Sequence, residues 1–207
     1  MNDSATLSAI PDLDPDDILS SSHRLARRVL VFRQTESTNQ LLLGLASSGA
    51  PEGTVVIANE QSAGRGQFGR AWHSAPNLGL WMSVLARPRR LLRDWQPLSE
   101  LAARAVIAAV HEQTGLECQI KAPNDVLLHG RKICGILIAT RSGPDAFAVI
   151  GIGLNVHHQT GDFPENLQAT AASVSQFAVA PRRSDLARAI LAFLSERLEV
   201  FDREIVG

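Results

Sequence analysis

Seven short apolar runs spaced along the chain constrain its fold more than any other feature of the sequence. Most are rich in Val, Ile and Leu and end at Gly, Pro or polar residues, which is typical of β-strands. They alternate irregularly with longer amphipathic segments, and this order predicts a mixed sheet with helices on one side, an α+β fold. The expected strands are Val29–Phe32, Val55–Asn59, Leu80–Ala86, Cys118–Lys121, Val126–Leu128, Lys132–Ala139 and Ala146–Val156.

Three longer segments are expected to be helices: Thr38–Ser47, Leu98–Thr114 and Ser184–Glu204. The last has leucine or isoleucine at intervals near four residues, so its apolar stripe is expected to pack on the core. Between two of the apolar runs, His129-Gly130 predicts a hairpin in which glycine supplies the turn.

Length and charge exclude several classes of protein. A chain of 207 residues with 45% hydrophobic residues can bury one substantial core. Its formal net charge of −1 argues against broad binding to DNA or anionic membranes. No apolar run reaches transmembrane length, and the acidic N-terminus lacks the features of a secretion signal. Cys118 and Cys134 have neither metal-ligand spacing nor the density of a disulfide scaffold, which favours core thiols in a reducing cytoplasm.

The acidic first segment, residues 1–22, is rich in Asp and Ser and is expected to be a flexible tail without chemistry. Residues 23–207 are expected to form one domain. Within this domain, His157 and His158 are adjacent, so on a strand they would face opposite sides, and no third ligand lies at a standard spacing. We therefore expect two surface histidines and no structural metal.

The stretch Gly64–Trp72, called the Gly-Arg loop below, combines three glycines with two arginines. Glycines allow close backbone approach, successive amides can surround an anion, and arginine adds a charge that physiological pH does not remove. The loop therefore predicts phosphate binding, although an ordinary Gly-rich surface loop also fits this motif taken alone. Its G-x-G-x-x-G spacing matches dinucleotide-binding folds, but no helix pattern follows it, and Arg87–Arg90 offers no carboxylate for a ribose. The absence of HRD and DFG triplets argues against a protein kinase.

Three further segments each allow a functional and a structural interpretation. Lys121 ends an apolar strand before a rigid proline, so its ammonium is either a fixed cation in a cleft or a solvated strand end. Within Glu36–Gln40, Ser37 or Thr38 either caps the following helix or holds a polar ligand group. The two glycines of Val149–Val156 mark either the close approach of a ligand or another backbone, or a bulge without function.

Taken in order, these segments resemble the catalytic domain of biotin-protein ligases, the enzymes that attach biotin to a lysine of a carrier domain. The resemblance extends from about Val31 to Val156, and the ordered set is far more specific than any one motif. The motifs are Glu36–Asn39, Gln61–Gly66, Gly69-Arg70-x-Trp72, Lys121-x-Pro123-Asn124-Asp125, Arg131–Leu137 and Gly151–Asn155.

This resemblance implies a fold of the class II aminoacyl-tRNA synthetase type, with a mostly antiparallel sheet flanked by helices. It also implies that biotin and Mg-ATP react to give biotinyl-5′-AMP and pyrophosphate. A lysine of the biotin carboxyl carrier protein of acetyl-CoA carboxylase then attacks the mixed anhydride. The resemblance assigns Lys121 and Arg65 to catalysis, and Ser37, Thr38, Asn39, Gln61, Gly66 and Lys121 to biotin. It assigns Arg65, Gly66, Gln67, Arg70, Trp72, Asn124 and Asn155 to ATP or the adenylate. The expected metal is the Mg²⁺ that ATP carries, with Asp125 as an outer-shell contributor.

Two positions depart from the family pattern beside the proposed chemistry. Ala122 stands where the family typically has Trp, so Lys121 is expected to be held less firmly. Gln67 stands where many members have Arg, so the adenylate is expected to escape more readily, although Gln still donates hydrogen bonds.

Further departures concern the ends of the chain and leave alternatives open. Relatives usually continue into a small β domain, which we expect to be absent after Gly207. Residues 1–22 are too short and acidic for a winged helix, so transcriptional repression is not expected.

A non-catalytic or weakly active biotin- or adenylate-binding relative is one alternative function. A lipoate or octanoate ligase, with a similar lysine and Gly130–Lys132 hairpin, is another. Pairing of two copies through a sheet edge is left open by the sequence.

Overall fold

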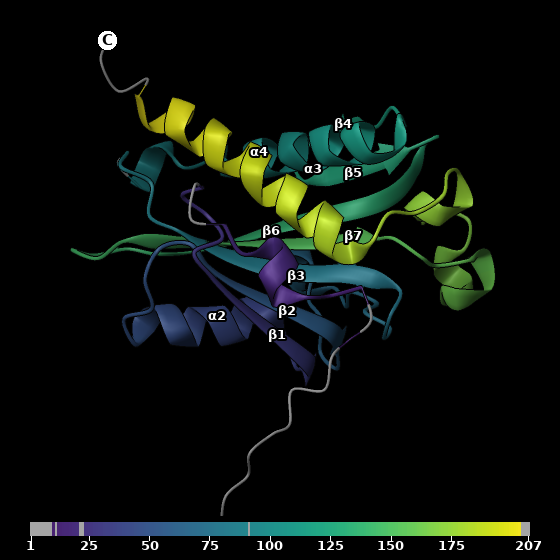
Figure 1. The fold of residues 1–207 in the computed structure, drawn as a ribbon, viewed down its shortest axis with the longest axis horizontal. Coiled ribbons are helices and arrows are strands. Elements are labelled where there is room, and N and C mark those ends of the chain that lie inside the picture. The colour runs from purple at the N-terminus through teal and green to yellow at the C-terminus, as the bar shows by residue number, and fades with distance from the viewer. Residues whose placement is uncertain (1–9, 11, 21–22, 91, 204–207) are drawn as a thin grey trace, which may run out of the picture.

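The computed structural model describes residues 10, 12–20, 23–90 and 92–203. Its centre is a seven-stranded mixed sheet in the order β1-β2-β3-β7-β6-β5-β4 (Figure 1). The first pair, β1 and β2, is parallel, and every other neighbouring pair is antiparallel. The strands are β1 (Arg28–Thr35), β2 (Thr54–Gln61), β3 (Gly79–Ala86), β4 (Gln119–Lys121), β5 (Asp125–Leu128), β6 (Arg131–Arg141) and β7 (Phe147–Asn155). The expected α+β fold with a mostly antiparallel sheet is confirmed.

Helices cover both faces of this sheet, so the expectation of helices on one side is wrong. The helices α3 (Leu98–Thr114) and α4 (Arg183–Arg203) pack together on one face, with the short α1 (Pro15–Ile18) beside α4. On the opposite face, α2 (Thr38–Ser47) contacts β2, β3 and β7 (Figure 1).

The central strands explain this second layer, because every residue of β3 is buried. A strand buried on both faces needs apolar cover on both. On the α2 side that cover is a separate small core made of Leu42, Ala46, Val56, Leu85, Phe147 and Val149.

The expected elements match the observed ones within about three residues at each end. The hairpin between β5 and β6 turns at His129 (φ 48°) and Gly130 (φ 76°), which is the pair of left-handed residues that a two-residue turn requires. Short 3₁₀ helices occupy the loops: η1 (Gln67–Gly69), η2 (Leu92–Asp94), η3 (Thr160–Asp162), η4 (Glu165–Leu167) and η5 (Val174–Gln176).

Part of the N-terminal segment packs onto the domain, so the expectation of a flexible tail is wrong for residues 12–20. Leu13 and Ile18 are buried in the main core. Asp12 pairs with the fully buried Arg183 (Oδ1 to Nη2, 2.6 Å), and a buried guanidinium needs such a partner. Burial raises the pKa of the Asp12 carboxyl, but hydrogen bonds from His157 and Arg183 outweigh it and hold that pKa well below its usual range. Residues 1–9, 11 and 21–22 lie outside the described residues, and the boundary at residue 23 stays a prediction.

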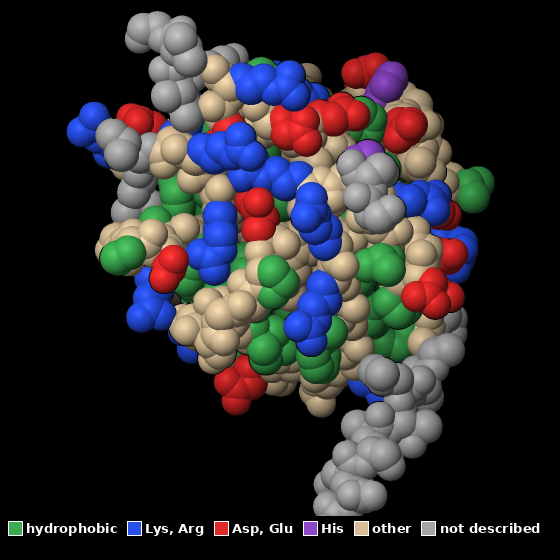
Figure 2. Space-filling view, turned by 60° about the vertical axis from the view of Figure 1, so that its left-hand side comes forward, with side chains coloured by type: hydrophobic (Ala, Val, Ile, Leu, Met, Phe, Trp, Pro, Cys, Tyr) green, Lys and Arg blue, Asp and Glu red, His purple; other side chains and the backbone are tan. Residues whose placement is uncertain are grey.

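A charged concavity lies at the end of the sheet where β1 begins and α4 ends. Within it, Arg24 pairs with Glu52 (2.8 Å) and with Asp202 and so ties the C-terminal end of α4 to the loop before β2. Figure 2 brings this end forward and shows Lys and Arg side chains interspersed with Asp and Glu. Because each carboxylate that lines this concavity is paired with an arginine of the same group, we assign it no ligand. No helix among the described residues is both long and apolar enough to cross a membrane.

Candidate functional site

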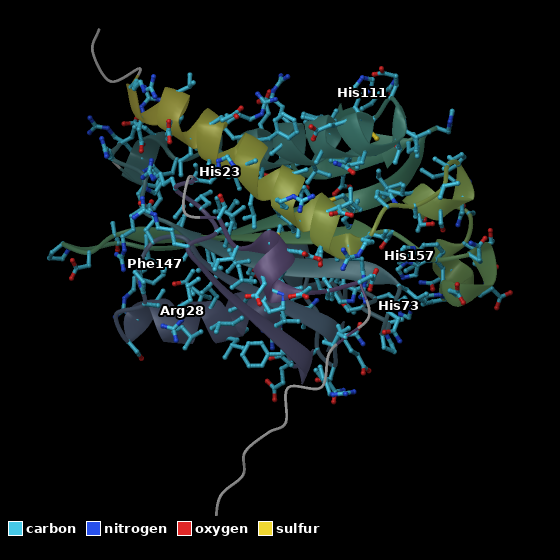
Figure 3. All side chains as sticks on the ribbon, in the orientation of Figure 1. His23, Arg28, His73, His111, Phe147 and His157 are labelled. Carbon is cyan, nitrogen blue, oxygen red and sulfur yellow. The ribbon has the colours of Figure 1, made fainter. Side chains whose placement is uncertain are left out.

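A cavity of about 480 Å³ lies beside the C-terminal ends of β1, β2 and β7. His73, which lines it, lies at this end of the sheet together with His157, whereas Arg28 and Phe147 lie at the other end (Figure 3). The cavity is bounded by the Gly-Arg loop, by the turn between β4 and β5, and by the loop of residues 160–172, called the wall loop below.

Every predicted site residue lines this one cavity. In particular, Arg65 and Lys121, which come from distant parts of the chain, share it. The others are Ser37, Thr38, Asn39, Gln61, Gly66, Gln67, Arg70, Trp72, Asn124, Asp125 and Asn155. The structure thus brings these residues together, whereas their individual roles stay predictions.

At the base of the cavity lies a hydrogen-bonded group of four residues, the polar floor. Thr38, Asn39 and Gln61 line the cavity, and the fully buried Ser83 lies beneath them without lining it. Gln61 Oε1 accepts from Thr38 N (2.9 Å) and Thr38 Oγ1 (3.2 Å). Ser83 Oγ lies 2.7 Å from Thr38 Oγ1 and donates to Asn39 Oδ1 (2.6 Å), and Asn39 Nδ2 donates to the Leu137 carbonyl (3.1 Å). Because each side chain fixes the next, the floor presents its polar atoms in one arrangement.

The N-terminus of α2 is capped by the polar floor and not by Ser37. Ser37 stands at the N-cap position of α2, yet its side chain makes no capping hydrogen bond, so simple capping does not explain it. The cap comes from Gln61 instead, through the bond to the Thr38 amide. Ser83 was missed from the sequence, although a hydroxyl within the otherwise apolar β3 was a usable signal.

The two glycines of β7 are sites of close approach, and no bulge interrupts the pairing of β7 with β3 or β6. A Cβ atom at Gly151 would lie 2.3 Å from Asn39 Oδ1, and one at Gly153 would lie 2.6 Å from Trp72 Nε1. Larger side chains at these positions therefore collide with two cavity-lining residues.

Trp72 forms a flat platform in the cavity. Its ring lies over Gly153 and Gly135, and Lys132 Nζ is 5.0 Å from the ring centroid, within cation–π distance. The indole Nε1 is buried and has no hydrogen-bond partner among the described residues.

The Gly-Arg loop is closed by its own backbone. Trp72 N donates to Gly64 O (2.9 Å), and Gly66 N donates to Arg70 O (2.7 Å). A Cβ at Gly64 would lie 2.7 Å from Ser74 Oγ, so only glycine fits at the base of the loop. The chain then enters β3 rather than a helix, in agreement with the exclusion of a dinucleotide-binding fold.

The basic residues of the cavity differ in how they are held. Lys121 and Arg65 are exposed, and neither donates a side-chain hydrogen bond within the described part of the chain. The neighbouring Ala122 is also exposed, so no aromatic ring covers Lys121 from that position. In contrast, Lys132 Nζ is fixed by Asp125 Oδ1 at 2.6 Å.

Two asparagines of the site hold backbone segments in place. Asn124 is buried, and its Nδ2 donates to Ile136 O (2.8 Å), which binds the turn after Lys121 to β6. Asn155 is also buried, and its Nδ2 donates to Ala172 O (2.9 Å). Its amide nitrogen therefore anchors the wall loop.

The described residues contain no preformed site for a metal ion. No group of three or more His, Cys, Asp or Glu side chains among them could hold a metal ion. Asp125 is the one carboxylate among the described cavity-lining residues, and it is paired with Lys132.

The expectation of two surface histidines is wrong. His158 is fully buried, with its ring stacked on Phe163 at 4.6 Å and edge-on to Trp81 at 5.9 Å. Burial, assisted by the neighbouring His73, lowers the pKa of His158 to about 4. His157 is partly buried and lies 3.2 Å from Asp12. His158 is buried because Phe163 of the wall loop covers its ring. No sequence pattern predicted that this loop lies against His158.

The wall loop is the largest part of the site that sequence reasoning missed. Its Leu167 and Ala169–Ala171 line the cavity, and its backbone pairs with the start of β6 through Lys132 N and Thr170 O (2.8 Å). Only short 3₁₀ turns occur in it, so it has no apolar periodicity to detect.

Comparison with known proteins agrees with this geometry. The profile of the biotin/lipoate A/B protein ligase family matches residues 31–155. The bifunctional ligase/repressor BirA of Bacillus subtilis is 44% identical over 144 residues, covering 69% of this chain and 44% of that protein. The biotin–[acetyl-CoA-carboxylase] ligase of Mycobacterium tuberculosis is 37% identical over 178 residues, covering 83% and 64%. Among solved structures, the Aquifex aeolicus biotin protein ligase in complex with biotin and ATP has a TM-score of 0.75 at 26% identity, covering 86% of this chain and 73% of that one.

The family profile and the fold thus agree in placing the chain among proteins built like the biotin and lipoate ligases. The chain belongs to the biotin/lipoate A/B protein ligase family. It spans less than two thirds of the length of either curated relative named above.

Proposed function

We propose that this chain is an ATP-dependent biotin-protein ligase, which activates biotin as biotinyl-5′-AMP and transfers it to a lysine of a biotin carboxyl carrier domain. The convergence of Arg65 and Lys121 on one cavity, whose polar floor is buried at Thr38, Asn39 and Ser83, carries the proposal. It is supported by the relatives, since that of Mycobacterium tuberculosis bears the name of this activity and the Aquifex aeolicus protein binds biotin and ATP.

The polar floor binds the ureido ring of biotin in this proposal. That ring has one carbonyl acceptor and two N–H donors, and Thr38, Asn39 and Gln61 offer both kinds of partner. Apolar residues beside the floor, Met82 and Ile152, suit the sulfur ring and the aliphatic chain. The biotin carboxylate then extends toward Lys121.

Adenylation depends on fixed positive charge. A carboxylate oxygen of biotin bonds to the α-phosphorus of ATP as the bond to pyrophosphate breaks, and negative charge builds on the phosphoryl oxygens. Lys121 and Arg65 stabilise this charge, with Lys132 as a third cation held by Asp125. The face of Trp72 supplies a stacking surface for the nucleotide.

Magnesium enters this site with ATP. Proteins usually hold Mg²⁺ through one or two carboxylates together with substrate phosphates. Asp125, the one carboxylate among the described residues that line the cavity, would supply one such ligand while it also pairs with Lys132. Bound Mg²⁺ neutralises phosphate charge, while the cations of the chain act at the α-phosphate.

The second step needs no nucleophile from the enzyme. The amine of the carrier lysine attacks the acyl carbon, a C–N bond forms, the C–O bond to AMP breaks, and the amine loses a proton. Both cysteines are free thiols, and burial raises the pKa of Cys118 to about 11 and that of Cys134 further, so neither competes as a thiolate. Free thiols also suit a reducing compartment such as the cytoplasm.

The test is ATP–pyrophosphate exchange by the full chain with biotin or with lipoate. The proposal predicts exchange with biotin at a rate far above that with lipoate. Exchange with lipoate alone identifies the related acyl ligase, and no exchange with either identifies a non-catalytic binder.

A further inference from the structure

Phe68 stands out at the mouth of the cavity. It lies at the tip of the Gly-Arg loop, lines the cavity opening, and is 91% exposed. Its backbone is left-handed at φ 57°, a conformation that is costly for a bulky residue other than glycine. An isolated exposed apolar side chain needs no explanation by itself, but one held in this conformation at the rim of a binding site does.

The Phe68 side chain is almost fully exposed, although the loop that carries it bounds the cavity. The hydrogen bonds of Gly66 N to Arg70 O (2.7 Å) and Arg70 N to Gln67 O (3.2 Å) close the turn that contains Phe68, and Gly69 continues it at φ 73°. The ring therefore presents its surface to whatever approaches the mouth from solvent.

The same mouth is positively charged. Among the residues that the structure describes, four cationic side chains line the cavity against the single carboxylate of Asp125, although the whole chain has a formal net charge of −1. After pyrophosphate leaves, the adenylate contributes one phosphate charge, so the excess of positive charge persists at the stage when an acceptor must approach. The four cations are Arg65, Arg70, Lys121 and Lys132.

Resting on the proposed function, we propose that Phe68 and the basic mouth form the docking surface for the acceptor protein, an acidic domain that presents an apolar side chain beside its target lysine. Desolvation of the Phe68 ring anchors the acceptor, and the positive charge steers it. The contact acts on the second step alone, because it holds the acceptor amine next to the acyl carbon.

The experiment separates the two half-reactions in the full chain. Phe68→Asn removes the ring while keeping a residue that accepts the left-handed backbone, and Phe68→Leu retains an apolar side chain. Val179, which is 94% exposed and does not line the cavity, supplies the matched control Val179→Ala. Each variant is assayed for biotin-dependent pyrophosphate exchange, for biotin transfer to a purified biotin carboxyl carrier domain, and for transfer to hydroxylamine.

For Phe68→Asn we expect KM for the carrier domain to rise about 10-fold, with exchange and transfer to hydroxylamine unchanged. Phe68→Leu should restore most of the loss, Val179→Ala should behave as wild type, and the wild-type KM for the carrier should rise with salt. An unchanged KM for the carrier in Phe68→Asn overturns the proposal, as does a parallel fall in exchange, which shows that the ring acts on the small ligands. Absence of exchange in the wild-type chain instead overturns the proposed function, and this inference with it.

Discussion

The contact between Gly151 and Asn39 gives the sharpest test of the polar floor. In Gly151→Ala the new methyl group would lie 2.3 Å from Asn39 Oδ1 and 2.7 Å from its Cγ, so the Asn39 side chain must move. That movement breaks the bonds from Ser83 Oγ (2.6 Å) and to Leu137 O (3.1 Å), both of which involve buried groups. At about 1–3 kcal/mol for each buried group left unpaired, we expect the free energy of unfolding to fall by about 2–4 kcal/mol.

The same displacement removes an aligned amide from the biotin site. A loss of about 1.4 kcal/mol in binding corresponds to a tenfold change in Kd, so we expect Gly151→Ala to weaken biotin binding at least about 10-fold. Isothermal titration with biotin and urea unfolding monitored by tryptophan fluorescence measure the two effects.

Two further variants make this test specific. Gly44 lies inside α2, and a methyl group added there would meet no neighbouring atom within 4 Å, so Gly44→Ala should stabilise the protein by about 0.5–1 kcal/mol and leave biotin binding unchanged. In an Asn39→Ala background the obstacle is gone, and Gly151→Ala should then cost less than about 0.5 kcal/mol. Wild-type biotin affinity in Gly151→Ala would refute the assignment of Asn39 to the biotin site.

Three other expectations follow from the site. Gln67→Arg should retain biotinyl-AMP longer than wild type, because it adds a cation at the mouth; equal release of the intermediate, measured by filtration and chromatography, contradicts this. His158 has its pKa lowered to about 4, so the unfolded state binds more protons between pH 6.5 and 4, and the free energy of unfolding should fall by about 3 kcal/mol as the pH drops through that range. His158→Phe should flatten this part of the pH profile of urea unfolding, and an unchanged slope counts against burial of a neutral imidazole. Ser83→Ala should weaken biotin binding about 3- to 10-fold in titration, because it unlinks Thr38 from Asn39, and wild-type affinity shows that the floor does not depend on this hydroxyl.

Local patterns predicted the elements because strands and helices in this chain have clear apolar periodicity. The helix Leu98–Thr114 ends at Gly115, which adopts the left-handed conformation common at helix ends, and its predicted bounds agree with the structure. The site motifs were also visible, because the residues of the Gly-Arg loop and of Lys121–Asp125 are unusual locally.

Long-range packing is what the sequence did not reveal. The position of α2 on the second face depends on the pairing of β3 with β2 and β7, which no local pattern encodes. Asp12 looked like part of an acidic tail because its partner Arg183 is far away in the chain. His158 looked exposed because the ring that covers it, Phe163, belongs to a loop without periodicity.

The most direct test of the central claim is transfer of radiolabelled biotin from ATP and biotin to a carrier domain, with the full chain compared with Lys121→Ala. The proposed mechanism predicts ATP-dependent labelling of the carrier by the wild-type chain and a rate lower by about 10²–10³ in Lys121→Ala, comparable to the loss of one preorganised charge-stabilising group. Equal labelling by the two proteins would contradict the role of Lys121 at the α-phosphate and the cationic site built around it.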